Sequence, residues 1–225
     1  MAETLPYQAP DRAMFEIRRV GWRKWLGASR ADAWTALASQ LDAKFDEGGW
    51  VKSDSVVLTV GADGSWRVVL DMYMVTVGRV SIPFTRLRVP FLNPSGFRFS
   101  VQKADFFTPV MTQLGAQDVS VGVPAFNESV VVKSSDAVRA VEFFQDAELR
   151  RLIVAAGDAK LEVADHGGGL GWKFPPQADV LQCVVAGDEH DLVKLRRLFR
   201  LCLAALDLLA EIGVAEVGDP GVSVY

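Results

Sequence analysis

The side chains best suited to chemistry in this 225-residue chain are arginines placed in strand-like sequence. In Thr85-Arg86-Leu87-Arg88-Val89, residues alternate between polar and apolar, so Arg86 and Arg88 should share one face of a strand. Arg98 belongs to the next predicted strand and could join them. Three guanidinium groups on one sheet face would bind a carboxylate, a phosphate or an acidic side chain of a partner.

Acidic residues nearby leave two other interpretations open. The arginines could face water, or they could form ion pairs with Asp71 and Asp105. Gln117 and Asp118 form a second candidate site, in a predicted loop after Gly115. If the protein is an enzyme acting on a small anionic molecule, the arginines would bind that molecule and Asp118 would act as acid or base. Otherwise Asp118 would simply fold onto the arginines.

A basic and aromatic arm is predicted at residues 1–29. Residues 1–30 carry six basic and three acidic side chains, a net charge of +3 in a chain whose total is −4. Such an arm would suit an anionic membrane surface or a nucleic-acid strand, or it could lay its tryptophans on the protein's own core or on a partner subunit. The residues that define it are Arg18, Arg19, Trp22, Arg23, Lys24 and Trp25.

Familiar catalytic and cofactor motifs are not recognisable in the sequence. His166 and His190 are the only histidines, and neither has the spacing of a zinc site. The glycine-rich stretch 167–171 is followed by Pro175-Pro176, whereas a phosphate-binding loop must lead directly into a helix. We therefore predict no metal, no cofactor and no catalytic residue, and we favour a protein that is not an enzyme.

The first part of the chain reads as a helix followed by four strands. Ser29 can cap a helix, with Asp32 three residues later as in a capping box, and apolar residues at helical spacing continue to Phe45. The residues after it are rich in Val, Ile, Phe and Tyr, and Asp63-Gly64 favours a tight hairpin turn. The expected elements are a helix over 30–45 and an antiparallel meander of strands over 55–60, 66–77, 79–89 and 97–101.

In the remainder of the chain, the expected strands and helices follow one another less regularly. We expect strands over 119–123 and 128–133, a helix over 136–155, strands over 160–164 and 180–186, and a long helix over 189–212. This order, α-ββββ-ββ-α-ββ-α, predicts an α+β fold with an antiparallel sheet and helices packed on one face. Residues 30–225 should form a single unit, with two lobes (30–111 and 112–225) as the alternative.

The composition of the chain indicates what class of protein it is and in which cellular compartment we expect it. The chain is 50% hydrophobic and 23% charged, as in an ordinary globular protein, and its net negative charge argues against a dedicated nucleic-acid binder. The longest stretch without Asp, Glu, Lys or Arg, Phe106–Gln117, has 12 residues, too few for a membrane-spanning helix. Cys183 and Cys202 lie in apolar surroundings, which is typical of buried free thiols. These features predict a cytoplasmic protein.

Several short motifs resemble those of a bacterial family of uncharacterised proteins. They are Thr85–Phe91 (TRLRVPF), Gly96–Phe99 (GFRF), Leu114–Asp118 (LGAQD), Phe126–Lys133 (FNESVVVK), Leu149–Ile153 (LRRLI) and Asp219–Val222 (DPGV), within residues 55–222. This chain departs from the pattern at Asn127, where the family would carry an acidic residue. The resemblance implies a bacterial protein and adds weight to Arg86, Arg88, Gln117 and Asp118, but it implies no activity.

Together these observations favour a non-enzymatic cytoplasmic protein that binds a partner or ligand and associates with itself. The alternatives are an enzyme acting on a small anionic molecule and a protein attached to a membrane surface through the basic arm.

Overall fold

The computed structural model describes residues 29–48, 54–60, 66–104, 117–165 and 174–222. Its helices are α1 (Arg30–Leu41), α2 (Pro124–Ser129), α3 (Ala137–Phe143), α4 (Ala147–Ala156) and α5 (Leu192–Glu211). Its strands are β1 (Lys44–Asp46), β2 (Ser55–Val60), β3 (Trp66–Val77), β4 (Val80–Leu92), β5 (Phe99–Lys103), β6 (Gln117–Asp118), β7 (Val130–Ser134), β8 (Lys160–Ala164) and β9 (Ala178–Ala186).

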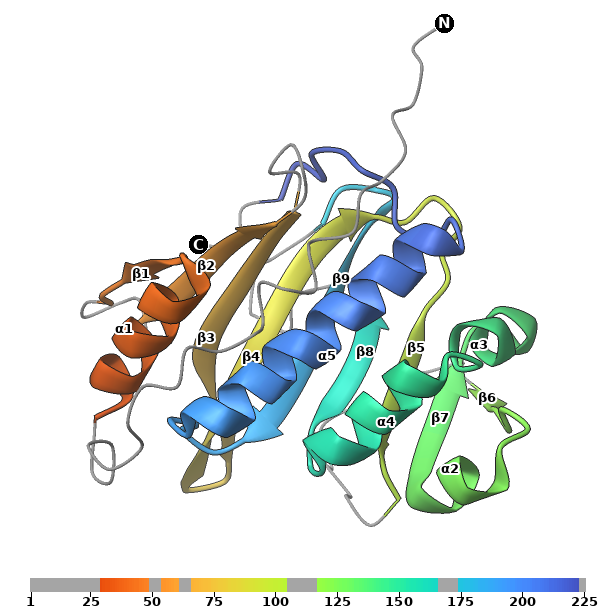
Figure 1. The fold of residues 1–225 in the computed structure, drawn as a ribbon, viewed down its shortest axis with the longest axis horizontal. Helices are drawn as coiled ribbons and strands as arrows, with labels where there is room; N and C mark the ends of the chain where they lie inside the picture. The colour runs from red at the N-terminus through yellow and green to blue at the C-terminus, as the bar shows by residue number, and fades with distance from the viewer. Residues whose placement is uncertain (1–28, 49–53, 61–65, 105–116, 166–173, 223–225) are drawn as a thin grey trace, which may run out of the picture.

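The strands form one antiparallel sheet in the order β1-β2-β3-β4-β9-β8-β5-β7-β6. Helices α1, α4 and α5 lie against one face of it, with α5 running across its middle (Figure 1). The predicted α+β fold with helices on one face is therefore confirmed.

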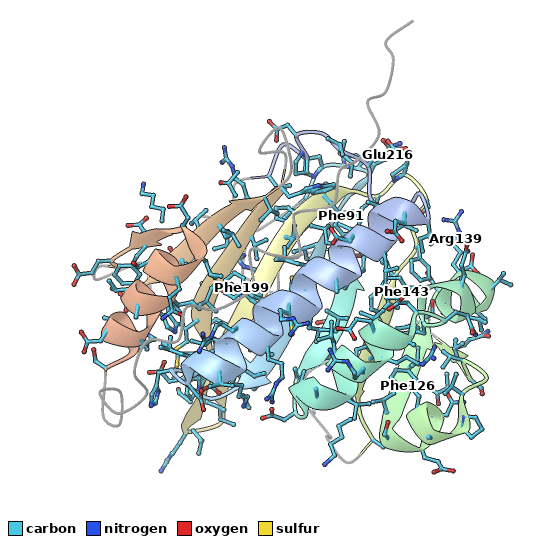
Figure 2. The ribbon with its side chains drawn as sticks, in the orientation of Figure 1. Phe91, Phe126, Arg139, Phe143, Phe199 and Glu216 are labelled. Atoms are coloured by element: carbon cyan, nitrogen blue, oxygen red, sulfur yellow. The ribbon has the colours of Figure 1, made fainter. Side chains whose placement is uncertain are left out.

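The main core lies between α5 and the central strands. Leu87 and Phe91 of β4 belong to this core together with Phe199 of α5, and all three are fully buried. Phe91 and Phe199, labelled in Figure 2, come from the sheet and from the helix that covers it. A second aromatic group continues this core under α3, where the rings of Phe99 and Phe143 have centroids 4.8 Å apart. Because side chains alternate along a strand, the residues between the core positions of β4 face the other side of the sheet.

The strand order differs from the expected four-strand meander at its last member. β2, β3 and β4 are neighbours as predicted, and Gly78, with φ +64°, lies in the two-residue turn between β3 and β4. β5, however, pairs with β7 and β8, and β9 and β8 lie between it and β4. Strands from residues 30–111 and 112–225 therefore interleave in one sheet.

Helix boundaries follow local capping groups. The capping box of Ser29 and Asp32 is present at the start of α1, but α1 ends at Leu41 because Asp42 is left-handed, with φ 53°. The single helix expected over 136–155 is two helices, because the Asp146 carboxylate accepts from the Leu149 amide at 2.6 Å and caps a new start. Likewise Asp191 caps α5, which therefore begins at Leu192 and not at residue 189 as expected.

The stretch before β7 was also predicted incorrectly. Residues 119–123, expected to form a strand, are irregular and follow the two-residue strand β6, and the strand expected over 128–133 begins only at Val130. Pro124 opens the short helix α2 instead, at a position where a helix tolerates its missing amide proton.

Candidate functional site

Arg86 and Arg88 lie on the sheet face that points away from α5, as their alternation predicts. Leu87, between them, is part of the core on the helical side. Both arginines are buried, with 8% and 2% of their surfaces exposed. Two long cationic side chains so enclosed need charged or hydrogen-bonding partners.

Asp71 of β3 forms ion pairs with both arginines. It is the register partner of Arg86, whose Nε donates to Asp71 Oδ1 at 2.7 Å and whose Nη2 donates to Oδ2 at 3.3 Å. Arg88 Nη2 also donates to Asp71 Oδ2. The ion pair with Asp71, one of the interpretations left open by the sequence, is therefore present; Asp105 lies outside the described residues.

Burial shifts the pKa values of two side chains here, Arg88 and Tyr73. Burial lowers the pKa of the Arg88 guanidinium, while Asp71 opposes that shift and Arg86 adds to it. Burial also raises the pKa of Tyr73, whose ring lies 4.5 Å from the Arg86 guanidinium carbon in a cation–π contact.

On the same face of the sheet, polar side chains continue from β4 onto its neighbours β9 and β8. Gln182 is the register partner of Arg88 and donates from Nε2 to Glu162 Oε1 at 2.7 Å. Lys160 Nζ lies 2.6 Å from Glu162 Oε2. These three residues are at most 5% exposed. We refer to this row across four neighbouring strands as the polar cluster: Asp71, Tyr73, Arg86, Arg88, Lys160, Glu162 and Gln182.

Arg98 belongs to a different network. Its Nε and Nη2 donate to Asp179 Oδ2 and Oδ1 at 3.1 and 3.0 Å, and its Nη1 lies 3.3 Å from Asp165 Oδ2. Asn93 Nδ2 donates to the same Asp179 carboxylate at 2.6 Å. This network ties the turn after β4 to the start of β9. Asp179 is the register partner of Phe91, so it leaves the sheet on the helical side.

Gln117 and Asp118 form β6, the outermost strand at the far edge of the sheet. The Asp118 side chain is 79% exposed and its Oδ1 lies 3.9 Å from Lys133 Nζ. Four strands separate β6 from β4, so the structure does not bring Asp118 to the arginines.

The histidines, the cysteines and the residues of the basic arm are not part of the polar cluster. His190 is exposed at the start of the α5 region, and His166 and the arm residues 18–25 lie outside the described residues. Cys183 and Cys202 are buried free thiols, and burial raises the pKa of Cys183 to about 12. Within the described ranges no three potential metal ligands gather at one place.

Lys160, Glu162 and Gln182 belong to the polar cluster but were not among the residues predicted from sequence. A signal was available in Lys160-Leu161-Glu162-Val163-Ala164, where charged and apolar residues alternate as they do around Arg86 and Arg88. That alternation predicts charges on one face of a strand, but nothing local shows that this strand lies two places from β4.

Comparison with known proteins gives little further guidance. No protein-family model and no curated protein matches the chain. Among solved structures, the crystal structure of the mycobacterial trehalose monomycolate transport factor A, TtfA, has a TM-score of 0.48 at 10% identity, over 84% of this chain and 97% of that chain. A structural similarity this weak does not indicate a function. No helix among the described residues has the length and apolar character needed to cross a bilayer.

Proposed function

We propose that this chain is a binding protein without catalytic activity, and that the polar cluster receives an anionic group of its ligand, a carboxylate or a phosphate. The observation that supports this is that Arg86 and Arg88 both donate to the one carboxylate of Asp71. With Lys160 and Glu162, the cluster contains three positive and two negative side chains. Because a guanidinium group attracts a carboxylate or phosphate strongly where water is largely excluded, an anion in contact with Arg86 and Arg88 would stabilise the folded protein.

The chemistry of the neighbouring groups supports binding over catalysis. The carboxylate considered as an acid or base, Asp118, is exposed on the far edge strand. The thiol of Cys183 has a pKa of about 12, so very little of it is thiolate at neutral pH. We also propose a cytoplasmic location, with which two buried free thiols are compatible.

Anion binding can be measured as a change in melting temperature. Phosphate and succinate are titrated into the full chain, with sodium chloride at equal ionic strength as the reference. A ligand at about 100 times its Kd stabilises a protein by ~2.7 kcal/mol, which is easily seen as a rise in Tm. The test variant is Arg88→Lys, which keeps the charge and loses the planar fork. The matched control is Arg98→Lys, the same change in the separate Asp179 network.

The proposal predicts that phosphate or succinate raises Tm above the chloride reference in the wild type and in Arg98→Lys, and raises it less in Arg88→Lys. Native mass spectrometry of the purified protein should also show a small anion that is lost on denaturation. Equal Tm values in all three salts, together with a protein mass that corresponds to the bare chain, would contradict anion binding.

We further propose that the protein associates with itself and belongs to the bacterial family that its motifs resemble. Met74, Val80 and Ile82 are large apolar side chains exposed at the end of the β3–β4 hairpin, which supports an interaction there. Sedimentation equilibrium of the wild type and of Ile82→Lys tests association, since a monomeric wild type would contradict it. Family membership predicts that chains carrying the Thr-Arg-x-Arg-x-Pro-Phe strand keep an acidic residue at the position of Asp71.

A further inference from the structure

A second concentration of arginines lies on the helical side of the molecule, where α4 and α5 pack together in antiparallel directions. Two cross-helix contacts follow one another, Arg200 with Glu148 at 3.5 Å and Arg197 Nη1 with the Ala155 carbonyl oxygen at 2.9 Å. Lys194 of α5 then lies 3.2 Å from Asp158, two residues after the end of α4. Arg151 projects beside the first of these contacts. We call Arg151, Arg197 and Arg200, with Glu148, the arginine seam.

The arginine seam carries an excess of positive charge. Arg151 and Arg200 share the single carboxylate of Glu148, while Arg197 is held by a backbone carbonyl oxygen. Three cations therefore accompany one anion, in a chain whose net charge is −4. Beyond the seam the excess reverses, because the single cation of Lys194 lies within 3.2 Å of two carboxylates, those of Asp158 and Glu189.

The arginines of the seam are accessible. The side chains of Arg151 and Arg200 are 59% and 50% exposed, and Arg197 is also exposed. Arg197 is already oriented by its bond to the Ala155 carbonyl, so it would lose less conformational entropy on binding than a mobile side chain would.

We propose that the arginine seam is a docking surface for an acidic segment of a partner protein. Arg151 already holds a carboxylate in the forked manner that such a partner would use, with Nε to Glu148 Oε2 at 2.7 Å and Nη2 to Oε1 at 2.6 Å. Val154 and Val193 are exposed on the same helices, one turn from Arg151 and Arg197 respectively. Arginines beside exposed apolar groups are the composition of a protein–protein interface.

Other anionic partners fit this surface less well. The only aromatic residue of α4 and α5, Phe199, is fully buried, so neither helix offers a ring on which a nucleic-acid base could stack. Two valines provide little apolar surface for insertion into a lipid bilayer. An acidic peptide with a few apolar residues matches both the positive charge of the arginine seam and the two exposed valines beside it.

The test measures binding of the full chain to a fluorescein-labelled helical peptide of glutamate and leucine, by fluorescence anisotropy. The same peptide with glutamine in place of glutamate is the ligand control. Arg197→Glu/Arg200→Glu is the test variant, and Lys133→Glu/Arg139→Glu is its control, because it makes the same change in net charge at two exposed cations outside the seam. Circular dichroism and Tm verify that both variants are folded.

We expect the glutamate peptide to bind the wild type and the control variant with similar affinity, and the test variant at least about tenfold more weakly, with affinity falling as salt is added. Equal weakening in both variants would mean that only net charge matters and would overturn the proposal. Binding of the glutamine peptide as tightly as the glutamate peptide would also overturn it. So would binding of phosphatidylserine vesicles or a single-stranded oligonucleotide through these arginines in the absence of peptide binding.

Discussion

Arg98 holds the carboxylate of Asp179 with two guanidinium nitrogens, Nε at 3.1 Å from Oδ2 and Nη2 at 3.0 Å from Oδ1. The two ends of this pair differ in exposure, since the side chain of Arg98 is 39% exposed and that of Asp179 only 3%. Losing the arginine would therefore leave a buried charge, whereas losing the carboxylate would leave a cation that water can reach.

This asymmetry predicts the effect of two single substitutions. Arg98→Ala should lower the free energy of unfolding by about 2–4 kcal/mol, because it leaves the buried carboxylate of Asp179 without its cation and with the Asn93 amide still donating to it. Asp179→Asn should cost less, because the amide keeps an acceptor for Arg98 and removes the buried charge. Urea unfolding of both variants measures the difference. An equal loss in the two variants, or a larger loss in Asp179→Asn, would show that this ion pair is not what stabilises the turn.

A second prediction concerns Asp71, the carboxylate shared by Arg86 and Arg88. Asp71→Asn should lower the free energy of unfolding by about 3–5 kcal/mol, because two buried guanidinium groups then lose their shared counter-charge. The control is Asp118→Asn on the exposed edge strand, with an expected change within about 0.5 kcal/mol. Similar losses in the two variants, measured by urea unfolding, would argue against a stabilising role of the polar cluster.

The features predicted correctly from sequence are those that depend on neighbours along the chain. Alternation around Leu87 was enough to place Arg86 and Arg88 on one face, and Ser29 with Asp32 was enough to place the start of α1. Asp71 could be considered as a partner because β3 and β4 are consecutive strands. These are local periodicities, hairpins and caps, whose physics is contained in short segments.

The features that could not be predicted depend on strand order. Arg98 follows β4 closely in sequence, but β9 and β8 lie between β4 and β5, so Arg98 meets Asp179 and not the polar cluster. Lys160 and Glu162 join the cluster for the same reason, because β8 pairs with β9 next to β4. Nothing in residues 93–99 alone reveals that β9, some eighty residues later, pairs with β4.

A third prediction concerns the buried pair of Lys160 and Glu162, which lie 2.6 Å apart. Lys160→Met alone or Glu162→Leu alone should each cost about 3–5 kcal/mol, because each leaves one buried charge. The double variant should be more stable than either single variant, because it removes both charges together. A double-mutant cycle from urea unfolding measures the coupling energy, and additive losses would show that the two charges do not stabilise each other.

The last prediction links the burial of Cys183 to alkaline stability. Its pKa is raised from 9.0 to about 12 by burial, so between these values the unfolded chain loses a proton that the folded protein keeps. The free energy of unfolding should therefore fall with rising pH, and this thiol should contribute a slope of ~1.4 kcal/mol per pH unit within that window. Other groups titrate there as well, so the measured quantity is the slope of the wild type minus that of Cys183→Ala in urea unfolding from pH 8 to about pH 11. Identical slopes in the two proteins would contradict the shift. A thiol reagent supplies the independent check, since Cys183 should react at neutral pH only after urea unfolds the chain.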